Sequence, residues 1–203
     1  RIPHESTAGR DLRAVAKTLG REPLIALLFT AQTLAIGLSA GTTAILTTFL
    51  MELRGFTQIT SKLGLIVFIS GLGLGRVFVG VLMRNTALHA VITWFFAASA
   101  VMLSLLYFVR LPTSVVFGLC FLAGLAASPL LPTIIAAAGL FYRDAAGTAM
   151  GAIKVAIPVG GVVIPALFSL ISEVGTLSLS LTLFPLSAVI AVVVMAASRQ
   201  IGR

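Results

Sequence analysis

The chain has 203 residues, of which 59% are hydrophobic and 10% are charged, and its formal net charge is +8 at pH 7. A soluble domain carries roughly a quarter of its residues as charged groups, so this composition excludes an ordinary soluble fold and favours a protein whose solvent is the lipid bilayer. The Lys and Arg residues are scattered between apolar segments and form no basic patch, so a nucleic-acid partner is not expected.

Long apolar intervals follow one another along the chain, and short connections between them hold most of the charges. A helix needs about 20 mostly apolar residues to cross a bilayer, so each interval predicts one transmembrane helix. We expect residues 1–22 to be a cytoplasmic loop segment and residues 23–203 to be an all-α bundle. The six predicted spans are 24–51, 63–83, 87–109, 113–140, 146–171 and 177–198.

The cations of the connections predict the orientation. Nine Lys and Arg residues fall on the side of the two termini, among them Arg84, Arg199 and Arg203, whereas only Arg54, Lys62 and Arg110 fall on the other side. Cytoplasmic loops are enriched in Lys and Arg. Both termini are therefore expected in the cytoplasm, with the chain in a plasma membrane such as the inner membrane of a bacterium.

The first predicted span carries a stripe of polar residues at helical spacing, formed by Gln32, Ser39, Thr43 and Thr47. Such a stripe can line a polar cavity, and Gln32, Ser39 and Thr43 are candidate substrate-binding residues. It can equally form hydrogen bonds between helices, which contribute about 0.6 kcal/mol per contact in a membrane. The sequence leaves both interpretations open.

The segment "GLSAG" at 37–41 matches the G-x-S-x-G pattern of hydrolases, but its predicted context is a helix interior rather than a strand-turn-helix elbow. No candidate base lies at the depth of Ser39, since His89 falls at the cytoplasmic start of the third span. No enzymatic activity is therefore expected. Gly37 and Gly41, four residues apart, predict a surface of small residues on which another helix packs.

The second and fifth spans each contain one cation, Arg76 and Lys154. Counted from the predicted cytoplasmic ends, both lie about 8 residues inside the membrane, or about 12 Å deep. A lysine at a bilayer centre costs about 2.5–3.5 kcal/mol, and no Asp or Glu lies inside any predicted span. The two cations are candidates to bind an anionic substrate. Alternatively, each pairs with an acid of a partner, or Arg76 extends to the cytoplasmic surface.

Residues that interrupt helices gather in the fourth and fifth spans. In membrane transporters, broken helices at matched positions of repeated units indicate a transport pathway and its hinges, although a kink without a function is an open alternative for Pro165. The predicted hinge and packing residues are Pro129, Pro132, Pro158, Gly160, Gly161 and Pro165.

An internal repeat relates the two halves of the bundle. At a constant offset of 87 residues, "GLSA" at 37–40 aligns with "GLAA" at 124–127, Gly64 aligns with Gly151 and Gly73 aligns with Gly160. Because a unit of three spans is odd, its second copy is inverted in the membrane. The sequence therefore predicts six transmembrane helices arranged as a 3+3 inverted repeat.

Two segments resemble the C-terminal six-helix half of major facilitator superfamily transporters. They are "GRVFVGVLMR" at 75–84 and the block at 124–173, which is similar to fucose-type sugar:proton symporters. That pattern has an apolar residue where Lys154 stands, whereas an Arg on the second span with a Lys on the fifth is similar to oxalate–formate exchangers. The resemblance implies a missing N-terminal six-helix half, a small-molecule substrate, and a coupling proton or counter-substrate.

The sequence thus predicts transport of a small solute by alternating access, with an organic anion as the first candidate. The resemblance implies symport or antiport without a cofactor, and no metal site is expected because the chain has a single Cys and no acidic cluster. Two alternatives stay open: neutral sugar:proton symport, and a non-transporting, truncated or partner membrane protein.

Overall fold

The structure is a computed structural model that describes the backbone of residues 22–82 and 88–201 and the side chains of residues 22–77 and 88–198. Within these ranges every regular element is helical, and six helical stretches are long and apolar enough to cross a membrane. The prediction of an all-α, multi-pass membrane protein is confirmed. Residues 1–21 of the loop predicted over 1–22, and the side chains of Arg84, Arg199 and Arg203, lie outside the described residues.

The first three spans are continuous helices, α2 (Pro23–Glu52), α3 (Gln58–Leu82) and α4 (Leu88–Phe108). Only α3 departs clearly from its predicted range, since it begins five residues before 63. Thr57 caps this helix: its Oγ1 accepts a hydrogen bond from the Thr60 N–H at 3.3 Å. The cap lets α3 begin outside the apolar interval, with polar residues in its first turns.

The last three spans are each interrupted. They consist of α5 (Thr113–Ala127) with α6 (Leu130–Phe141), α7 (Ala146–Lys154) with α8 (Ala156–Val174), and α9 (Leu177–Ser180) with α10 (Leu183–Ile201); a single turn, η1 (Arg143–Ala145), precedes α7.

A proline follows closely after each of the three breaks. Proline has no N–H, so the carbonyl four residues before it loses its helical partner. Pro132, Pro158 and Pro185 remove the partners of the carbonyls at positions 128, 154 and 181, and the helices break next to these three positions. No proline lies in the interior of α2, α3 or α4, and these helices are continuous.

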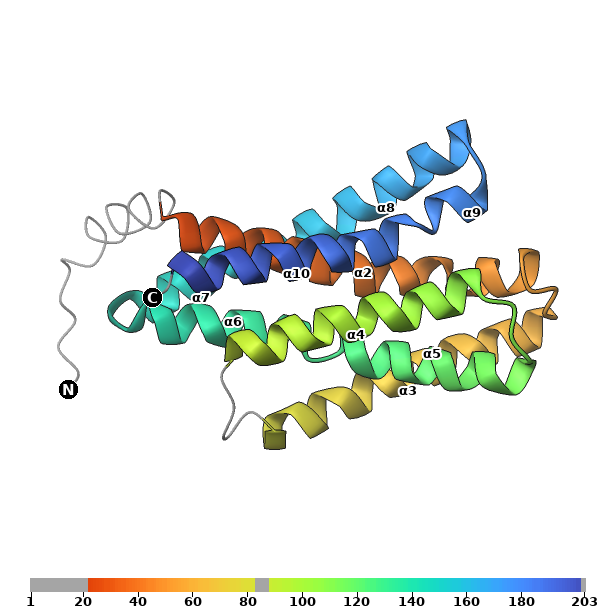
Figure 1. Cartoon of the computed structure of the whole chain (residues 1–203), viewed down its shortest axis with the longest axis horizontal. Helices are drawn as coiled ribbons and strands as arrows, with labels where there is room; N and C mark the ends of the chain where they lie inside the picture. The colour runs from red at the N-terminus through yellow and green to blue at the C-terminus, as the bar shows by residue number, and fades with distance from the viewer. Residues whose placement is uncertain (1–21, 83–87, 202–203) are drawn as a thin grey trace, which may run out of the picture.

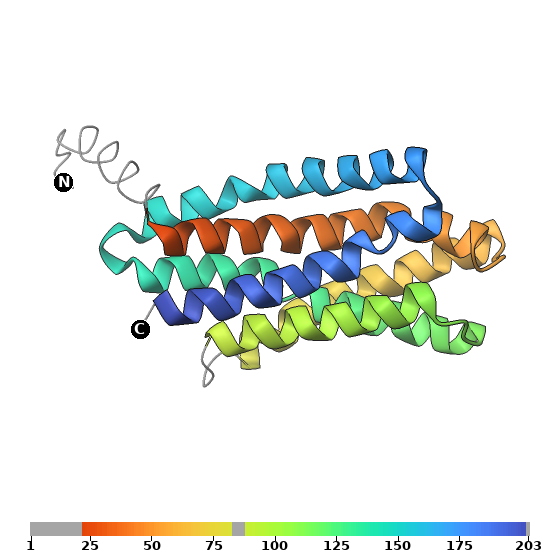
Figure 2. The same ribbon diagram turned by 45° about the horizontal axis from the view of Figure 1, so that its top comes forward.

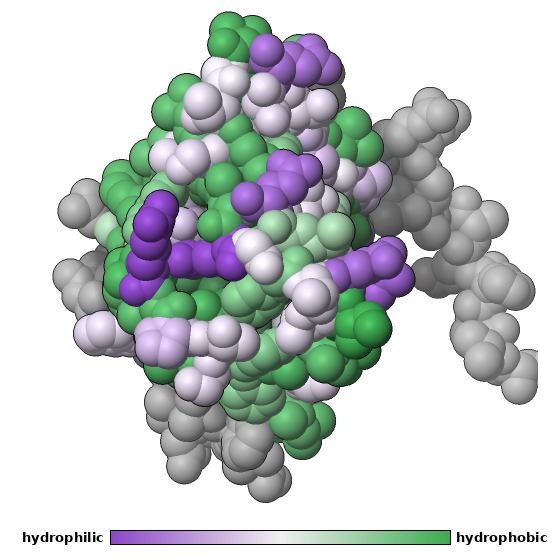
Figure 3. Space-filling view, turned by 90° about the vertical axis from the view of Figure 1, so that its right-hand side faces the viewer, coloured by the Kyte–Doolittle hydropathy of each residue, from purple (hydrophilic) through white to green (hydrophobic). Residues whose placement is uncertain are grey.

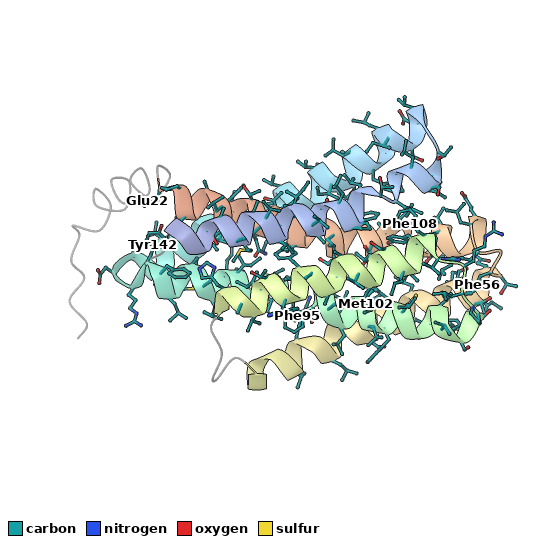
Figure 4. All side chains as sticks on the ribbon, viewed as in Figure 1. Glu22, Phe56, Phe95, Met102, Phe108 and Tyr142 are labelled. Atoms are coloured by element: carbon teal, nitrogen blue, oxygen red, sulfur yellow. The ribbon has the colours of Figure 1, made fainter. Side chains whose placement is uncertain are left out.

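The helices form one elongated bundle (Figure 1). We call the end that holds the start of α2 the proximal end, and the end that holds the connections 53–57, 109–112 and 175–176 the distal end. Glu22 and Tyr142 lie near each other at the proximal end (Figure 4). Burial, and then the negative charge of Glu22, raise the pKa of the Tyr142 hydroxyl. Helices α2 and α6 pack on each other, with the start of α2 beside the end of α6 (Figure 4).

Contacts between helices set the order across the bundle. Helix α3 packs on both α5 and α2, the α5–α6 pair also packs on α2, and α2 packs on α7 and α8. Helices α4 and α10 pack on each other, α4 packs on α5 and α6, and α10 packs on α2. Figures 1 and 2 both show α3 and α8 on different sides of α2. Helices α3 and α8 therefore flank α2 on different sides.

A chain of aromatic rings holds the distal half together. Phe49 of α2 meets Tyr107 of α4 edge to face with centroids 4.9 Å apart, Tyr107 lies 5.9 Å from Phe184 of α10, and Phe184 stacks on Phe168 of α8 at 5.5 Å. Aromatic pairs contribute about 0.5–1.5 kcal/mol beyond burial. Phe184 fits here because Gly41 of α2 offers no side chain at the contact, so this glycine packs a helix, as predicted from the sequence.

Candidate functional site

Glycines bring α2 and α8 close together. An added Cβ at Gly160 would overlap the Thr33 carbonyl, and one at Gly37 would overlap the side chain of Ile164. These two contacts run in the same direction along both helices, so α2 and α8 are parallel. Gly161 is less restricted, since its Cβ would lie 4.0 Å from Ile36. The close approach fixes the height of α7 and α8 relative to α2.

A second glycine crossing joins α3 to α5. An added Cβ at Gly71 would overlap the Phe121 carbonyl, and one at Gly124 would overlap the Phe68 carbonyl. One turn further, Gly75 lies against Ser128, whose hydroxyl donates a hydrogen bond to the Leu72 carbonyl. Close approach through small residues and hydrogen bonds between helices are the means by which membrane helices associate. In the same segment Gly73 has open space around it, so Gly71 and Gly75 make this contact.

Lys154 ends α7 at the break between α7 and α8, and its side chain is exposed. Pro158 leaves the Lys154 carbonyl without a helical donor. On the α2–α8 register set by Thr33 and Gly160, Lys154 lies level with Leu27 of α2. Within the described residues, Lys154 forms no ion pair or hydrogen bond.

Arg76 follows Gly75 on α3, and its side chain is also exposed. Because Gly75 contacts Ser128, Arg76 lies beside the break between α5 and α6. Gly64 of α3 contacts Leu50 of α2. Because α2 and α3 run antiparallel, Arg76, which follows Gly64 by about 12 residues, lies level with about Leu38, the same number of residues before Leu50. Among the described side chains, no acid pairs with Arg76.

The sequence placed Arg76 and Lys154 at equal depth, and the helix contacts place them at different depths. Their levels on α2, Leu38 and Leu27, are 11 residues apart, or about 16 Å at 1.5 Å per residue. A depth counted from the helix ends is wrong here because the ends are not level. Helix α3 ends further from the proximal end of the bundle than α7 begins (Figure 1). Helix α2 also lies between α3 and the α7–α8 pair, the helices that carry the two cations (Figures 1 and 2).

The polar stripe of α2 divides into a buried and a partly exposed part. Gln32 is fully buried, and neither its Oε1 nor its Nε2 has a hydrogen-bond partner in the described structure. Ser39 and Thr43 are partly exposed and donate to their own helix, Ser39 Oγ to the Ala35 carbonyl at 3.0 Å and Thr43 Oγ1 to the Ser39 carbonyl at 2.7 Å. Their oxygens keep lone pairs that can accept a hydrogen bond from a ligand.

The structure therefore does not gather the five candidate substrate-binding residues into one pocket. Ser39 and Thr43 share a face of α2 and lie near the level of Arg76, but Arg76 is on a different helix, α3, beside the α5–α6 break. Lys154 lies level with the proximal part of α2. The predicted hinge residues, in contrast, do adjoin helix breaks: Pro129 and Pro132 at α5–α6, and Pro158 at α7–α8. Pro165 lies within α8 without ending it.

Arg54 makes several contacts in the structure, although the sequence analysis treated it only as a cation of a connecting loop. Its Nη2 donates to the Leu106 carbonyl at 2.6 Å and the Val109 carbonyl at 2.5 Å, and its guanidinium lies 5.3 Å from the centroid of Phe49. Burial, and then the nearby charge of Arg110, lower the Arg54 pKa. Arg54 thus caps the negative C-terminal end of α4, a structural role that explains its position without a ligand.

Figure 3 presents the distal end of the bundle. Hydrophilic side chains lie across the middle of this end, and hydrophobic side chains lie around them. Among the described residues, no group of three His, Cys, Asp or Glu side chains is close enough to hold a metal ion.

The described geometry is that of a multi-pass membrane protein with six spans, two exposed cations inside spans and helix breaks near both. Searches against protein-family models and against curated proteins find no match to the chain.

Proposed function

We propose that the chain forms the C-terminal six-helix half of a secondary transporter of the major facilitator kind and moves a small organic anion by alternating access. The proposal includes a 3+3 inverted repeat, cytoplasmic termini and a plasma-membrane location, such as the inner membrane of a bacterium. Its other half supplies the opposite wall of the substrate cavity.

The pattern of helix pairs supports the inverted repeat. In the predicted repeat, α2 corresponds to α5–α6 and α3 corresponds to α7–α8. The first helix of each unit makes a parallel, glycine-mediated contact with the second helix of the other unit, α2 with α8 and α5 with α3. Gly37 and Gly124, which align at the offset of 87 residues, take part in equivalent pairs.

The observation that carries the proposal is the exposure of two cations on the two least buried spans. In the most apolar stretch of each span, 28% of the residues of α3 and 22% of those of α7–α8 are buried. In the other four spans the buried share is 44–56%. A charged side chain facing lipid is costly, and neither Arg76 nor Lys154 has an acidic partner in the described part of the chain. A second six-helix half that covers these spans and encloses a wet cavity removes this cost.

The three interrupted spans supply places where the half can bend. Carbonyls that lack a helical donor lower the resistance of a helix to bending, and the breaks at Pro132 and Pro158 adjoin Arg76 and Lys154 respectively. Rocking of one half against the other at such points is the usual basis of alternating access.

Uptake of radiolabelled lactate, oxalate and fucose into proteoliposomes that contain the complete protein tests the proposal. We expect uptake of at least one anion, and we expect Lys154→Ala to abolish it. Val155→Ala is the matched control, because Val155 is the adjacent exposed residue. Unchanged anion uptake in Lys154→Ala at equal protein amount refutes Lys154 as a ligand.

The two alternatives predict different results. Fucose uptake that acidifies the vesicle lumen, without anion uptake, indicates neutral sugar:proton symport. Absence of all uptake, together with co-purification of an acidic membrane partner that is lost in Lys154→Ala, indicates a non-transporting partner protein.

A further inference from the structure

The exposed surface of α3 divides lengthwise into two strips of different chemistry. Helix α3 is continuous, so each residue is turned by about 100° from the one before it. Five of its exposed residues fall within about 60° of one another around the axis. We call these five residues the cationic strip: Gln58, Lys62, Ile69, Gly73 and Arg76. The strip extends from the first turn of the helix to Arg76, a length of about 27 Å.

The strip beside it is apolar. Over 58–77, where the structure describes the side chains of α3, the other exposed residues are Ile59, Leu63, Ile66, Ser70, Leu74 and Val77. Five of these are large aliphatic residues with 47–75% of their surface exposed. The sixth, Ser70, donates its hydroxyl to the Ile66 carbonyl at 2.8 Å and so satisfies its donor within its own helix. This apolar strip is suited to lipid or to an apolar partner.

Both charges of α3 lie on the cationic strip. Lys62 and Arg76 are the two charged residues of the helix, which has no Asp or Glu, and no acid of the described chain pairs with either of them. They are 14 residues apart in the chain, or about 21 Å along the axis. A charged side chain that faces lipid is costly. With an apolar strip beside it, the helix can turn the cationic strip toward a wet space in the complete protein.

Gly73 leaves room along the cationic strip. A Cβ added there would meet no atom within 4 Å, whereas Gly71 and Gly75 lie against α5. Packing within the described chain therefore does not explain Gly73, although glycine inside a helix costs about 1 kcal/mol relative to alanine. It lies one turn from Arg76, on the side toward Lys62. Its missing side chain leaves space for a solute next to the helix.

We infer that the cationic strip lines a water-filled path from the distal end to Arg76, and that Lys62 is the outer position that attracts the anion into this path. Helix α3 begins at the distal end (Figure 1), and Lys62 lies in its second turn. A cation at the mouth of a cleft raises the local concentration of an anion and speeds its arrival. The role of Lys62 rests on the proposed transport of an organic anion, whereas the wet strip can be tested without transport.

Cysteine modification tests the wet strip. Ile69→Cys and Leu74→Cys in the complete protein are treated with a membrane-impermeant sulfonated maleimide, and mass spectrometry follows the peptide that holds each new cysteine, so other cysteines do not affect the result. Ile69 and Leu74 are 47% and 48% exposed but lie on different strips. The reactive form is the thiolate, which apolar surroundings disfavour, so we expect Ile69→Cys to react about tenfold faster or more.

Gly73→Cys controls for depth, because Gly73 adjoins Leu74 in the chain but lies on the cationic strip. We expect it to react like Ile69→Cys. Equal rates for the three variants, including no modification of any of them, overturn the inference.

Uptake kinetics test the role of Lys62. Uptake of lactate and of oxalate into proteoliposomes is measured at low and high ionic strength for the wild type, Lys62→Ala and Lys62→Arg. At low salt we expect Lys62→Ala to lower kcat/KM about tenfold, the low end of the range for electrostatic focusing, through KM and with kcat unchanged. High salt should shrink this loss. Lys62→Arg keeps the charge and should behave as the wild type.

Leu63→Ala is the matched control, because Leu63 is the adjacent exposed residue on the apolar strip. We expect it to leave kcat/KM unchanged at both ionic strengths. A loss in Lys62→Ala that does not depend on salt, or no loss at all, overturns the role of Lys62.

The outcomes distinguish the inference from the function on which it rests. Anion uptake together with equal modification of the three cysteine variants overturns the water-filled path and leaves anion transport standing. Absence of uptake for both anions, with modification confined to the cationic strip, overturns anion transport and the role of Lys62 and supports the wet strip.

Discussion

Gly160 of α8 lies directly against the backbone carbonyl of Thr33 on α2, with no room for a Cβ between them. This contact sets the height at which α7 and Lys154 stand beside α2. A backbone carbonyl cannot move aside as the end of a flexible side chain can, so the α2–α8 crossing is specific for glycine.

We expect Gly160→Ala to destabilise the protein by about 1–3 kcal/mol, the usual cost of overpacking a tight contact. Gly73→Ala is the control, since Gly73 has open space around it and lies inside a helix, and we expect it to be neutral or to stabilise by up to about 1 kcal/mol. Thermal unfolding in detergent measures both. Equal melting temperatures for the two variants would contradict the tight crossing.

Arg54→Ala should destabilise the distal end, because the Leu106 and Val109 carbonyls lose their donor and Phe49 loses its cation. Because Arg54 is only partly buried, we expect a loss of about 2 kcal/mol, less than the sum of about 3 kcal/mol at the low end for two charge-assisted bonds. Arg110→Ala, which removes a repelling neighbour of Arg54, should be neutral or slightly stabilising. Hydrogen exchange of the amides over 104–112 provides the local readout, and unchanged exchange in Arg54→Ala argues against the cap.

Pro158→Ala restores an N–H four residues after Lys154 and should join α7 to α8 into one helix. We expect a gain in stability of up to about 3 kcal/mol, the intrinsic cost of proline in a helix, with slower hydrogen exchange around 154–158. Under the proposed function the stiffer span should transport more slowly. Pro23→Ala is the control, because Pro23 occupies the first turn of α2, where proline is tolerated. An equal effect of the two substitutions would exclude Pro158 as the cause of the break.

Gln32→Met should stabilise the chain when no substrate is present. The buried amide of Gln32 has no hydrogen-bond partner in the described structure, and an unsatisfied buried polar group costs about 1–3 kcal/mol. Methionine has a similar shape and no such cost. Gln58→Met, on the exposed first turn of α3, should change little. A destabilised Gln32→Met protein would show that the amide is already satisfied, and higher stability with lower anion uptake would support a binding role.

Particular residues show how far sequence reasoning reached. Gly37, Gly41 and Gly160 were predicted to pack helices, and each lies in a close contact. The breaks after Ala127 and Lys154 adjoin predicted hinge prolines. Pro185 carries the same signal for the break between α9 and α10. Pro165 carries it too without ending α8, so the signal alone does not locate a break.

The candidate site was harder to predict. Depths counted from the ends of the spans made Arg76 and Lys154 level, because that count assumes helices that all end in one plane. Contacts such as Gly64 with Leu50 and Gly160 with Thr33 show that they are not level. The cap formed by Arg54 on α4 was also missed, since its partners are more than fifty residues away in the chain.

The sequence by itself determined that the chain is helical, that six stretches are long and apolar enough to cross a membrane, and that its fourth and fifth spans are interrupted near prolines. Lipid offers no hydrogen bonds, so each apolar segment must satisfy its own backbone, and this requirement is local. Only the tertiary structure decided which residues meet. Helices in lipid gain little from burying apolar surface and associate through close contacts of small residues. Those contacts join residues that are distant in the chain, as Thr33 and Gly160 are, and they set the depth of each charge.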